Sequence, residues 1–310
     1  MKNWIYLISV IVAAGCNAST NEGSVLVLNT HTLSSEDGWE YIDNGTLKIG
    51  VDRSRGACIG FFGESQTGRN LLNHFDEGRF IQQSYYGQAD GSDWNGKPWV
   101  YNPIQGGSWL RVPAKVHEFN KAEDELYAKI EPRHWASGVL CPEMVMQQTI
   151  TLDGDVAKIS FSMKYDGPDQ GEPRHQELPA VFIDGALPNF YYTKNGTLTN
   201  EAPRILAENG KEGVDGLGLG ESTSEWVAYL DDTNWGIGIF TPGTTDFTVY
   251  RALGDGTTGE KGSACSYVAP LRTFALTKGL EVEYDVYLTI GTLKEITRRF
   301  SALKLNSHLY

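Results

Sequence analysis

Turn dipeptides divide this chain into short runs of alternating or β-branched residues, and this pattern constrains the fold more than any other feature. Asn-Gly and Asp-Gly pairs favour the tight turns of β-hairpins because they tolerate positive φ angles. They begin at Asn44, Asp153, Asp166, Asp184, Asn195 and Asp255. The strand-like runs are residues 24–30, 47–52, 125–132, 146–154, 157–165, 179–185, 225–230, 235–240, 246–252, 272–277 and 281–291. The sequence therefore predicts an all-β protein.

A helix is predicted only near the C-terminus, where Leu293, Ile296, Phe300 and Leu303 repeat at helical spacing. No low-complexity linker or fixed-period repeat divides the chain, which favours one domain, residues 25–310. The strands fit a large two-sheet antiparallel β-sandwich with a short C-terminal helix. Residues 200–224 form the longest weakly patterned segment, which we expect to be a functional loop.

The first residues resemble a bacterial lipoprotein signal. Lys2 is followed by an apolar run, residues 4–12, that is too short for a stable membrane span. Ala13 to Cys16 resembles a lipobox, so we predict a signal peptide over 1–16, a lipid anchor to the membrane at Cys16 and a polar tether over 17–24. The expected location is the cell envelope, at the outer membrane or the cell surface. The alternative is an ordinary secretory signal cleaved near residue 18 or 19.

The charge balance and the cysteines narrow the function. With 39 acidic and 26 basic residues, the chain carries a net charge of −13, which argues against nucleic acid as a partner. Cys58, Cys141 and Cys265 fit no zinc pattern, and we expect buried, inert thiols. No metal-binding motif, nucleophile elbow or phosphate loop occurs. We predict no metal and no cofactor, although calcium remains possible.

An unusually polar strand, residues 78–86, suggests a sugar-binding surface. Amide and aromatic side chains match the hydroxyls and flat C–H faces of sugars. Alternation places Gln83 and Tyr85 on one face and Gln82 and Tyr86 on the other, so neither face is apolar. We predict that this strand lines a cleft. Tyr85 is a candidate acid or base, and Arg79 is a candidate for lowering its pKa or for binding a uronate.

A loop rich in tryptophan follows. Trp94, Trp99 and Trp109 fall within sixteen residues, among glycines and prolines. We predict that these indoles stack on sugar rings, with Asn102 and Gln105 as polar partners. The competing interpretation is a loop that packs its aromatic residues beneath itself.

Two histidine clusters are further candidates. His134 and Trp135 follow a predicted strand and suggest an acid/base group beside a sugar subsite. His175 and Glu177 lie two residues apart on an extended segment, so they share a face, with Arg174 as a nearby binding residue. The alternatives are a histidine at the rim of a buried tryptophan and a solvated loop.

Several carboxylates suit glycoside hydrolysis. Glu177 and Glu225 form our candidate acid/base pair, and Trp226 is a candidate binding residue beside Glu225. Glu143 and Asp184 are weaker candidates, which fit charges on an edge strand equally well.

Three stretches resemble the galactose-mutarotase-like superfamily, the β-supersandwich of aldose epimerases and of domains in glycosidases and polysaccharide lyases. They are residues 42–62 with 68–72, residues 146–167, and residues 226–243. The resemblance implies this fold and carbohydrate chemistry. The resemblance places His175 where an epimerase histidine would stand, but no late Pro-Glu-Thr-like segment occurs, which favours cleavage over mutarotation.

Together these observations predict an envelope enzyme that cleaves a polysaccharide or oligosaccharide by hydrolysis or β-elimination. Two alternatives remain open. One is a glycan-binding surface lipoprotein without catalysis. The other is a sugar epimerase of the aldose 1-epimerase type.

Overall fold

The computed structural model describes residues 38–200, 205–206 and 224–307, which all belong to one compact unit. The predicted signal peptide, Cys16, the tether and most of segment 200–224 lie outside the described residues. No described helix is long and apolar enough to cross a membrane.

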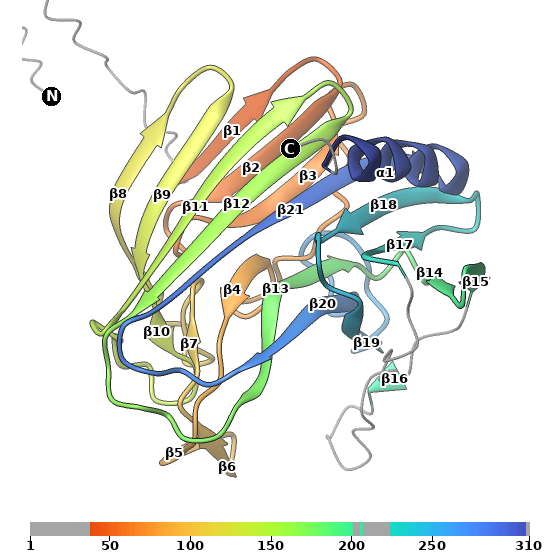
Figure 1. Cartoon of the computed structure of the whole chain (residues 1–310). Coiled ribbons are helices and arrows are strands. Elements are labelled where there is room, and N and C mark those ends of the chain that lie inside the picture. The colour runs from red at the N-terminus through yellow and green to blue at the C-terminus, as the bar shows by residue number, and fades with distance from the viewer. Residues whose placement is uncertain (1–37, 201–204, 207–223, 308–310) are drawn as a thin grey trace, which may run out of the picture. The chain divides into compact units, whose positions relative to one another are not determined.

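Two large sheets make up most of the described chain (Figure 1). The first sheet has ten strands in the described residues, in the order β1-β2-β3-β4-β13-β20-β19-β16, with β7 and β10 attached beside β4. Its strands are β1 (Trp39–Asp43), β2 (Leu47–Asp52), β3 (Cys58–Glu64), β4 (Ile81–Ser84), β7 (Pro103–Ile104), β10 (Arg133–His134), β13 (Arg174–Asp184), β16 (Ile205–Leu206), β19 (Asp246–Ala252) and β20 (Cys265–Phe274).

The second sheet has nine strands in the described residues, in the order β15-β14-β17-β18-β21-β12-β11-β9-β8. These strands are β8 (Lys115–Lys121), β9 (Glu125–Glu131), β11 (Met144–Asp153), β12 (Val156–Tyr165), β14 (Asn189–Lys194), β15 (Thr197–Asn200), β17 (Trp226–Leu230), β18 (Trp235–Phe240) and β21 (Leu280–Thr292). Within the described chain, the pairing is antiparallel except between β16 and β19.

A separate hairpin pairs β5 (Ala89–Trp94) with β6 (Lys97–Val100). The helix α1 (Leu293–Ser307) follows β21 directly and packs Ile296 and Phe300 against the second sheet. It begins with a capping box, because the Thr292 backbone N–H donates to Glu295 Oε2 at 2.8 Å and the Glu295 N–H donates back to Thr292 Oγ1 at 3.4 Å.

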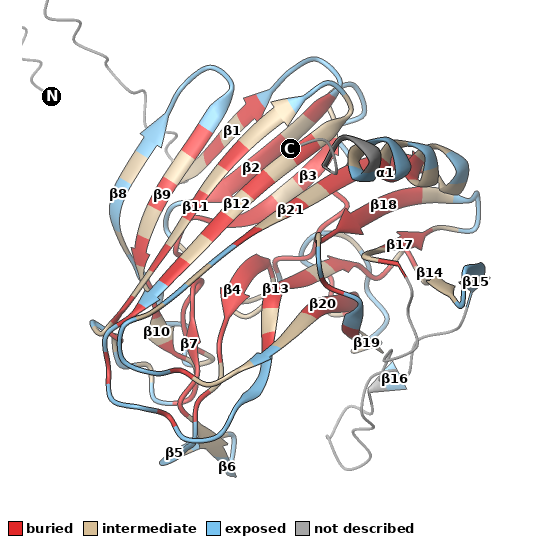
Figure 2. Cartoon of the chain, viewed as in Figure 1, coloured by how far each residue is buried: buried red, intermediate tan, exposed pale blue. Residues whose placement is uncertain are grey.

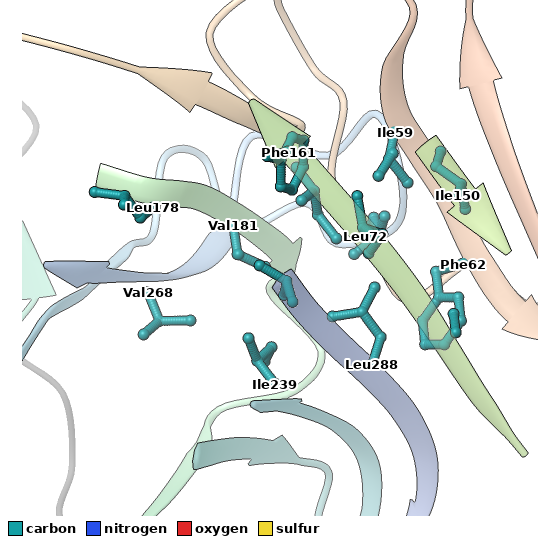
Figure 3. Packing of buried hydrophobic residues seen from close by; sticks show 14 of the residues in the cluster. Ile59, Phe62, Leu72, Ile150, Phe161, Leu178, Val181, Ile239, Val268 and Leu288 are labelled. Atoms are coloured by element: carbon teal, nitrogen blue, oxygen red, sulfur yellow. The ribbon is translucent and has the colours of Figure 1, made fainter. Parts of the chain in front are cut away.

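The core lies between the two sheets. Strands β11 and β12 alternate buried and half-buried residues along their length, as expected when one face of a strand is packed (Figure 2). Figure 3 shows Phe62 and Val181 of the first sheet packed among residues of the second, such as Phe161 and Leu288. Burial of apolar surface of this extent is the main stabilising term.

The structure confirms the predicted all-β sandwich and its C-terminal helix. Most predicted strands within the described residues appear close to their predicted bounds. Strand β20 is the main difference, since it starts at Cys265 rather than at residue 272. Cys58, Cys141 and Cys265 are buried and unpaired, as expected.

Candidate active site

A pocket of about 450 Å³ lies on the face of the first sheet that points away from the core. Its floor comes from β4, β13, β19 and β20, and its sides come from the 76–79 turn, the β5–β6 hairpin and Trp135. The lining residues are Asp76, Gly78, Arg79, Gln82, Ser84, Tyr86, Trp94, Trp99, Asn102, Ile104, Trp135, Glu177, Ala180, Phe182, Tyr250, Ala252, Cys265 and Tyr267.

A β-bulge in β13 brings Glu177 onto the pocket floor. Glu177 pairs with Leu271 of β20, and Val181 pairs with Val268, so four steps along β13 match three along β20. The extra residue reverses the alternation. As a result Glu177 and Phe182 both line the pocket although they lie five positions apart, which in a regular strand would place them on opposite faces, while Val181 points into the core.

Three hydroxyl groups surround the Glu177 carboxyl group. The Tyr267 hydroxyl donates to Glu177 Oε1 at 2.5 Å. Ser84 is the direct cross-strand partner of Glu177, and the Tyr86 hydroxyl also favours the carboxylate form of Glu177. Burial nevertheless raises the pKa of Glu177, and these hydrogen bonds oppose the shift only in part. A pocket carboxyl group with a raised pKa is a candidate for acid/base work.

Aromatic rings build the rest of the floor. Tyr250 stacks on Tyr267 at 4.3 Å between ring centroids, and Phe182 packs against Tyr267 at 4.6 Å. Burial raises the pKa of Tyr86, Tyr250 and Tyr267 well above the usual value, and the nearby Glu177 raises the pKa of Tyr86 further. These tyrosines therefore stay protonated and can donate hydrogen bonds, but they are poor bases.

The Tyr86 backbone is fixed by a buried amide. Gln176 Oε1 accepts from the Tyr86 N–H at 2.7 Å, and Gln176 Nε2 donates to the Tyr86 carbonyl at 3.0 Å. This pair extends the contact between β4 and β13 beyond the end of β4. It places the Tyr86 ring in the pocket beside Glu177.

The rim carries the charges of the 76–79 turn. Arg79 Nη1 donates to the Ser263 carbonyl at 2.8 Å, and its Nε lies 3.9 Å from Asp76 Oδ2. Gln82 Nε2 donates to the Gly78 carbonyl at 2.6 Å, while its Oε1 accepts from the Gly106 N–H at 2.7 Å. Gln82 thus joins the turn to the 105–107 segment.

Trp94, Trp99 and Trp135 form the aromatic side of the pocket, and we call these three residues the aromatic wall. The Trp94 ring centroid lies 4.6 Å from that of Trp99 and 5.9 Å from that of Trp135. Both ring pairs are in edge-to-face contact. Asn102 fixes one end of the wall, since its Oδ1 accepts from Trp99 Nε1 at 3.2 Å and its Nδ2 donates to the Tyr85 carbonyl at 2.7 Å.

The structure brings together eight of the predicted site residues. They are Arg79, Gln82, Tyr86, Trp94, Trp99, Asn102, Trp135 and Glu177. The others lie outside this pocket, for identifiable physical reasons.

Tyr85, Gln83 and Gln105 are part of the protein interior. The Tyr85 hydroxyl donates to Gln83 Oε1 at 2.9 Å, and Gln83 Nε2 donates to the Gln147 carbonyl at 3.0 Å. Gln105 Nε2 donates to Gln148 Oε1 at 2.9 Å. The core face of β4 is thus polar but satisfied by internal partners, which corrects their assignment to a sugar cleft. Burial also raises the pKa of Tyr85 well above its usual value, so it does not suit a base.

His134 and Trp109 hold loops in place. His134 Nδ1 accepts from the backbone N–H groups of Ala136 and Ser137, so its Nε2 carries the proton and donates to Asp90 Oδ2 at 2.7 Å. Trp109 Nε1 donates to the Ala136 carbonyl at 2.8 Å. Both contacts are structural, and neither side chain lines the pocket.

Arg174 and His175 lie at the exposed start of β13, where His175 Nδ1 contacts Thr273 Oγ1 at 2.9 Å. Trp226 begins β17 of the second sheet and Glu225 directly precedes it, both beside α1. Glu225 pairs with Lys304 at 2.9 Å, and Trp226 packs on Phe300. Glu177 and Glu225 therefore do not share the pocket, which corrects their proposed pairing. Glu143 and Asp184 also lie outside it.

Sequence analysis missed Asp76, Ser84, Phe182, Tyr250 and Tyr267 as site residues. Ser84 lies within the polar strand, residues 78–86, so its position in the sequence was sufficient to predict it as a site residue. Tyr250 and Tyr267 could not be predicted from the sequence, because only the pairing order β13-β20-β19 brings them to the pocket. No group of three or more potential metal ligands occurs among the described residues.

Comparison with known proteins identifies the fold. No family model and no curated protein sequence matches the chain. A structure from Escherichia coli K12, provisionally named as an aldose 1-epimerase, aligns with a TM-score of 0.52 at 14% identity, over 83% of this chain and 100% of that one. A galactose mutarotase-like protein from Lactobacillus casei aligns with a TM-score of 0.51 at 11% identity, over 82% and 100%. The chain therefore has the galactose-mutarotase-like fold, as the sequence resemblance implied.

Proposed function

We propose that this protein is a sugar-processing enzyme of the aldose 1-epimerase type, which interconverts the two anomers of an aldose by opening and closing its ring. The observation that carries the proposal is the Glu177 carboxyl group on the pocket floor, with a raised pKa and the Tyr267 hydroxyl bonded to it at 2.5 Å. The fold shared with the epimerase-like structures is consistent with this chemistry, but it is the site on which the proposal rests.

In the proposed reaction, the Glu177 carboxylate takes the proton from the anomeric hydroxyl group. The anomeric carbon–oxygen bond becomes a carbonyl, the bond from that carbon to the ring oxygen breaks, and the ring oxygen takes a proton from water while the Tyr86 hydroxyl donates a hydrogen bond to it. Rotation about the neighbouring carbon–carbon bond presents the other face of the carbonyl. The same proton transfers in reverse then close the ring, so no atom or electron is gained or lost.

The pKa shifts favour Glu177 as the base. General-base catalysis is most efficient when the pKa of the base lies near the operating pH, and burial moves the pKa of Glu177 in that direction. β-Elimination with a tyrosine base needs a lowered tyrosine pKa, whereas burial raises the pKa of Tyr86, Tyr250 and Tyr267. The directions of these pKa shifts therefore favour epimerisation over β-elimination.

Hydrolysis is the second candidate function, and one observation favours it. Asp76 and Glu177 line the same pocket, so two carboxyl groups face one cavity. Asp76 lies beside Arg79, with 3.9 Å between Asp76 Oδ2 and Arg79 Nε. Hydrolysis releases new reducing ends from a glycan, and epimerisation releases none, so the two functions are separable in one assay.

The test is polarimetry on freshly dissolved α-D-glucose and α-D-galactose. The full chain is expected to accelerate the drift to the equilibrium rotation, and Glu177→Gln is expected to lower the catalysed rate by about 100-fold or more. Glu225→Gln is the matched control, because Glu225 lies outside the pocket, and it should keep the rate. A Glu177→Gln variant with full activity would contradict the proposal. A protein that binds sugars but never accelerates the drift would be a binding protein.

We propose further that the enzyme works in the cell envelope, held by a lipid at Cys16. The support is the lipobox-like sequence Ala13 to Cys16. Metabolic labelling with a palmitate analogue should mark the full chain and fail to mark Cys16→Ser. Equal labelling of both proteins would contradict the anchor.

A further inference from the structure

The β5–β6 hairpin carries two tryptophans, Trp94 and Trp99, that lie outside the core between the two large sheets. Most residues of Ala89–Val100 are exposed, and Trp94 and Trp99 are among the few that are partly buried. An isolated two-stranded hairpin is at best marginally stable in water. The hairpin forms no part of the core between the two large sheets. Its aromatic residues face the pocket instead.

Specific contacts hold this hairpin in position. Asp90 accepts from the buried His134 ring at 2.7 Å, and Trp99 Nε1 donates to Asn102 at 3.2 Å. His134 is itself fixed by two backbone N–H groups at its other ring nitrogen. These contacts give the hairpin a defined place beside the pocket without burying it.

A glycine makes room for the third member of the aromatic wall. A Cβ atom at Gly78 would lie 2.7 Å from the Trp135 ring, closer than such atoms approach. The Trp135 indole therefore packs against the backbone of the same turn that carries Arg79. Edge-to-face contacts with Trp94 then keep the indoles in fixed orientations. Each of the three rings remains partly exposed.

We infer that the aromatic wall binds a second sugar ring, so that the substrate is the reducing end of an oligosaccharide rather than a free monosaccharide. This inference rests on the proposed function, since it assumes that the reacting ring lies at Glu177. Two groups of residues line the pocket: sheet residues around Glu177 form its floor, and the hairpin and Trp135 form the aromatic wall. Its volume of about 450 Å³ lies in the range of pockets that bind drug-sized ligands, which are larger than one hexose.

The chemistry of the wall matches a pyranose ring. Indole rings offer flat apolar surface, which suits the C–H face of a sugar. The reacting anomeric carbon belongs to the terminal ring, so only the reducing end can be processed. The bond between the two rings is not broken, and the second ring contributes affinity alone.

The experiment is isothermal calorimetry on the full chain carrying Glu177→Gln, which separates binding from turnover. The probes are two matched pairs, D-glucose with cellobiose and D-galactose with 4-O-β-galactobiose. Each disaccharide is expected to bind roughly two- to tenfold more tightly than its monosaccharide, as one added aromatic contact implies. Adding Trp94→Ala, or Gly78→Ala to displace Trp135, should reduce this ratio towards one. Trp109→Phe is the control, since Trp109 lies outside the pocket, and it should keep the ratio.

The inference and the proposed function fail in different ways. Disaccharide and monosaccharide affinities that are equal, a ratio unaffected by both wall variants, or no binding of any probe would each overturn the inference. Accelerated mutarotation by the unmodified chain, lost in Glu177→Gln, would still support the proposed function in those cases. A wall-dependent preference for disaccharides without any catalysed mutarotation would leave the inferred site standing and refute the epimerase.

Discussion

At the scale of single residues, the site is defined by the environment of one carboxyl group. Glu177 is buried enough for its pKa to rise, and the hydroxyls of Tyr267 and Tyr86 limit that rise. Without these donors, a buried carboxyl group stays neutral and cannot act as a base. With these donors, Glu177 can ionise, although its ionisation lowers the stability of the fold. Functional sites often lower stability in this way.

The Tyr267 hydrogen bond should be visible in the pH dependence of the rate. Because this bond lowers the pKa of Glu177, Tyr267→Phe is expected to raise that pKa further. The acid limb of the kcat/KM profile, where Glu177 becomes protonated as pH falls, should move to higher pH. Tyr287→Phe on the second sheet is the control. A limb that stays in place in Tyr267→Phe would mean that another group controls it.

The raised pKa of Glu177 also predicts a pH-dependent stability. In the unfolded chain Glu177 titrates near its ordinary value of 4.5, and in the folded chain it titrates higher. Its ionisation therefore destabilises the fold as pH rises through the folded pKa, and has no such effect below the unfolded one. Glu177→Gln should have the same Tm as the unmodified protein at pH 4 and a higher Tm at pH 8. A Tm difference that is equal at both values would contradict this account.

At this scale, sequence reasoning selected pocket-lining residues where the local pattern carried the information. The polar strand near Gln82 and the tryptophans at 94 and 99 were found because their residue types are unusual for a core. It failed for Gln83, Tyr85 and His134, whose partners come from distant parts of the chain and make them structural. Residue type alone does not reveal whether a buried polar group is already satisfied.

At the scale of elements, two local features position the site. The bulge in β13 sends Glu177 to the pocket and keeps Val181 in the core. The β5–β6 hairpin brings tryptophans to the same pocket. Turn dipeptides and alternation predicted most strands, but the bulge was not predicted, because it depends on pairing with two neighbouring strands. The hairpin was recognised only as a tryptophan-rich loop.

The contact between Asp90 and His134 is expected to control the order of the hairpin. Asp90→Ala removes the acceptor for His134 Nε2, and amide hydrogen exchange in residues 89–100 should become faster. The Tm should change little, because the hairpin lies outside the core. Asp90→Asn retains an acceptor oxygen and should restore most of the protection, and Asp124→Ala in the β8–β9 turn is a control. Unchanged exchange in Asp90→Ala would show that other contacts suffice.

At the scale of the whole molecule, one core joins the two sheets of a galactose-mutarotase-like fold. This architecture was predictable, because strand periodicity, turn pairs and the absence of other helices leave few alternatives. The location of the site was not, because the pocket forms where strands far apart in sequence become neighbours. Glu177 and Tyr267 lie ninety residues apart and are joined only by the sheet order.

The shared core predicts a large stability effect from a single substitution. Leu288 is fully buried on β21 between the sheets, and Leu288→Ala should lower the free energy of unfolding by about 2–5 kcal/mol in urea titration. Glu283→Ala is exposed on the same strand and should change it by less than about 0.5 kcal/mol. Similar effects of the two substitutions would contradict the assigned orientation of β21.

The central claim is that Glu177 catalyses anomer interconversion of a reducing sugar. The most direct measurement is NMR exchange spectroscopy between the α and β anomeric protons of a reducing disaccharide at equilibrium, with the full chain present in catalytic amount. Exchange cross-peaks that appear with the unmodified protein and vanish with Glu177→Gln are the predicted result. Absence of exchange with the unmodified protein, or equal exchange in both, would contradict the claim.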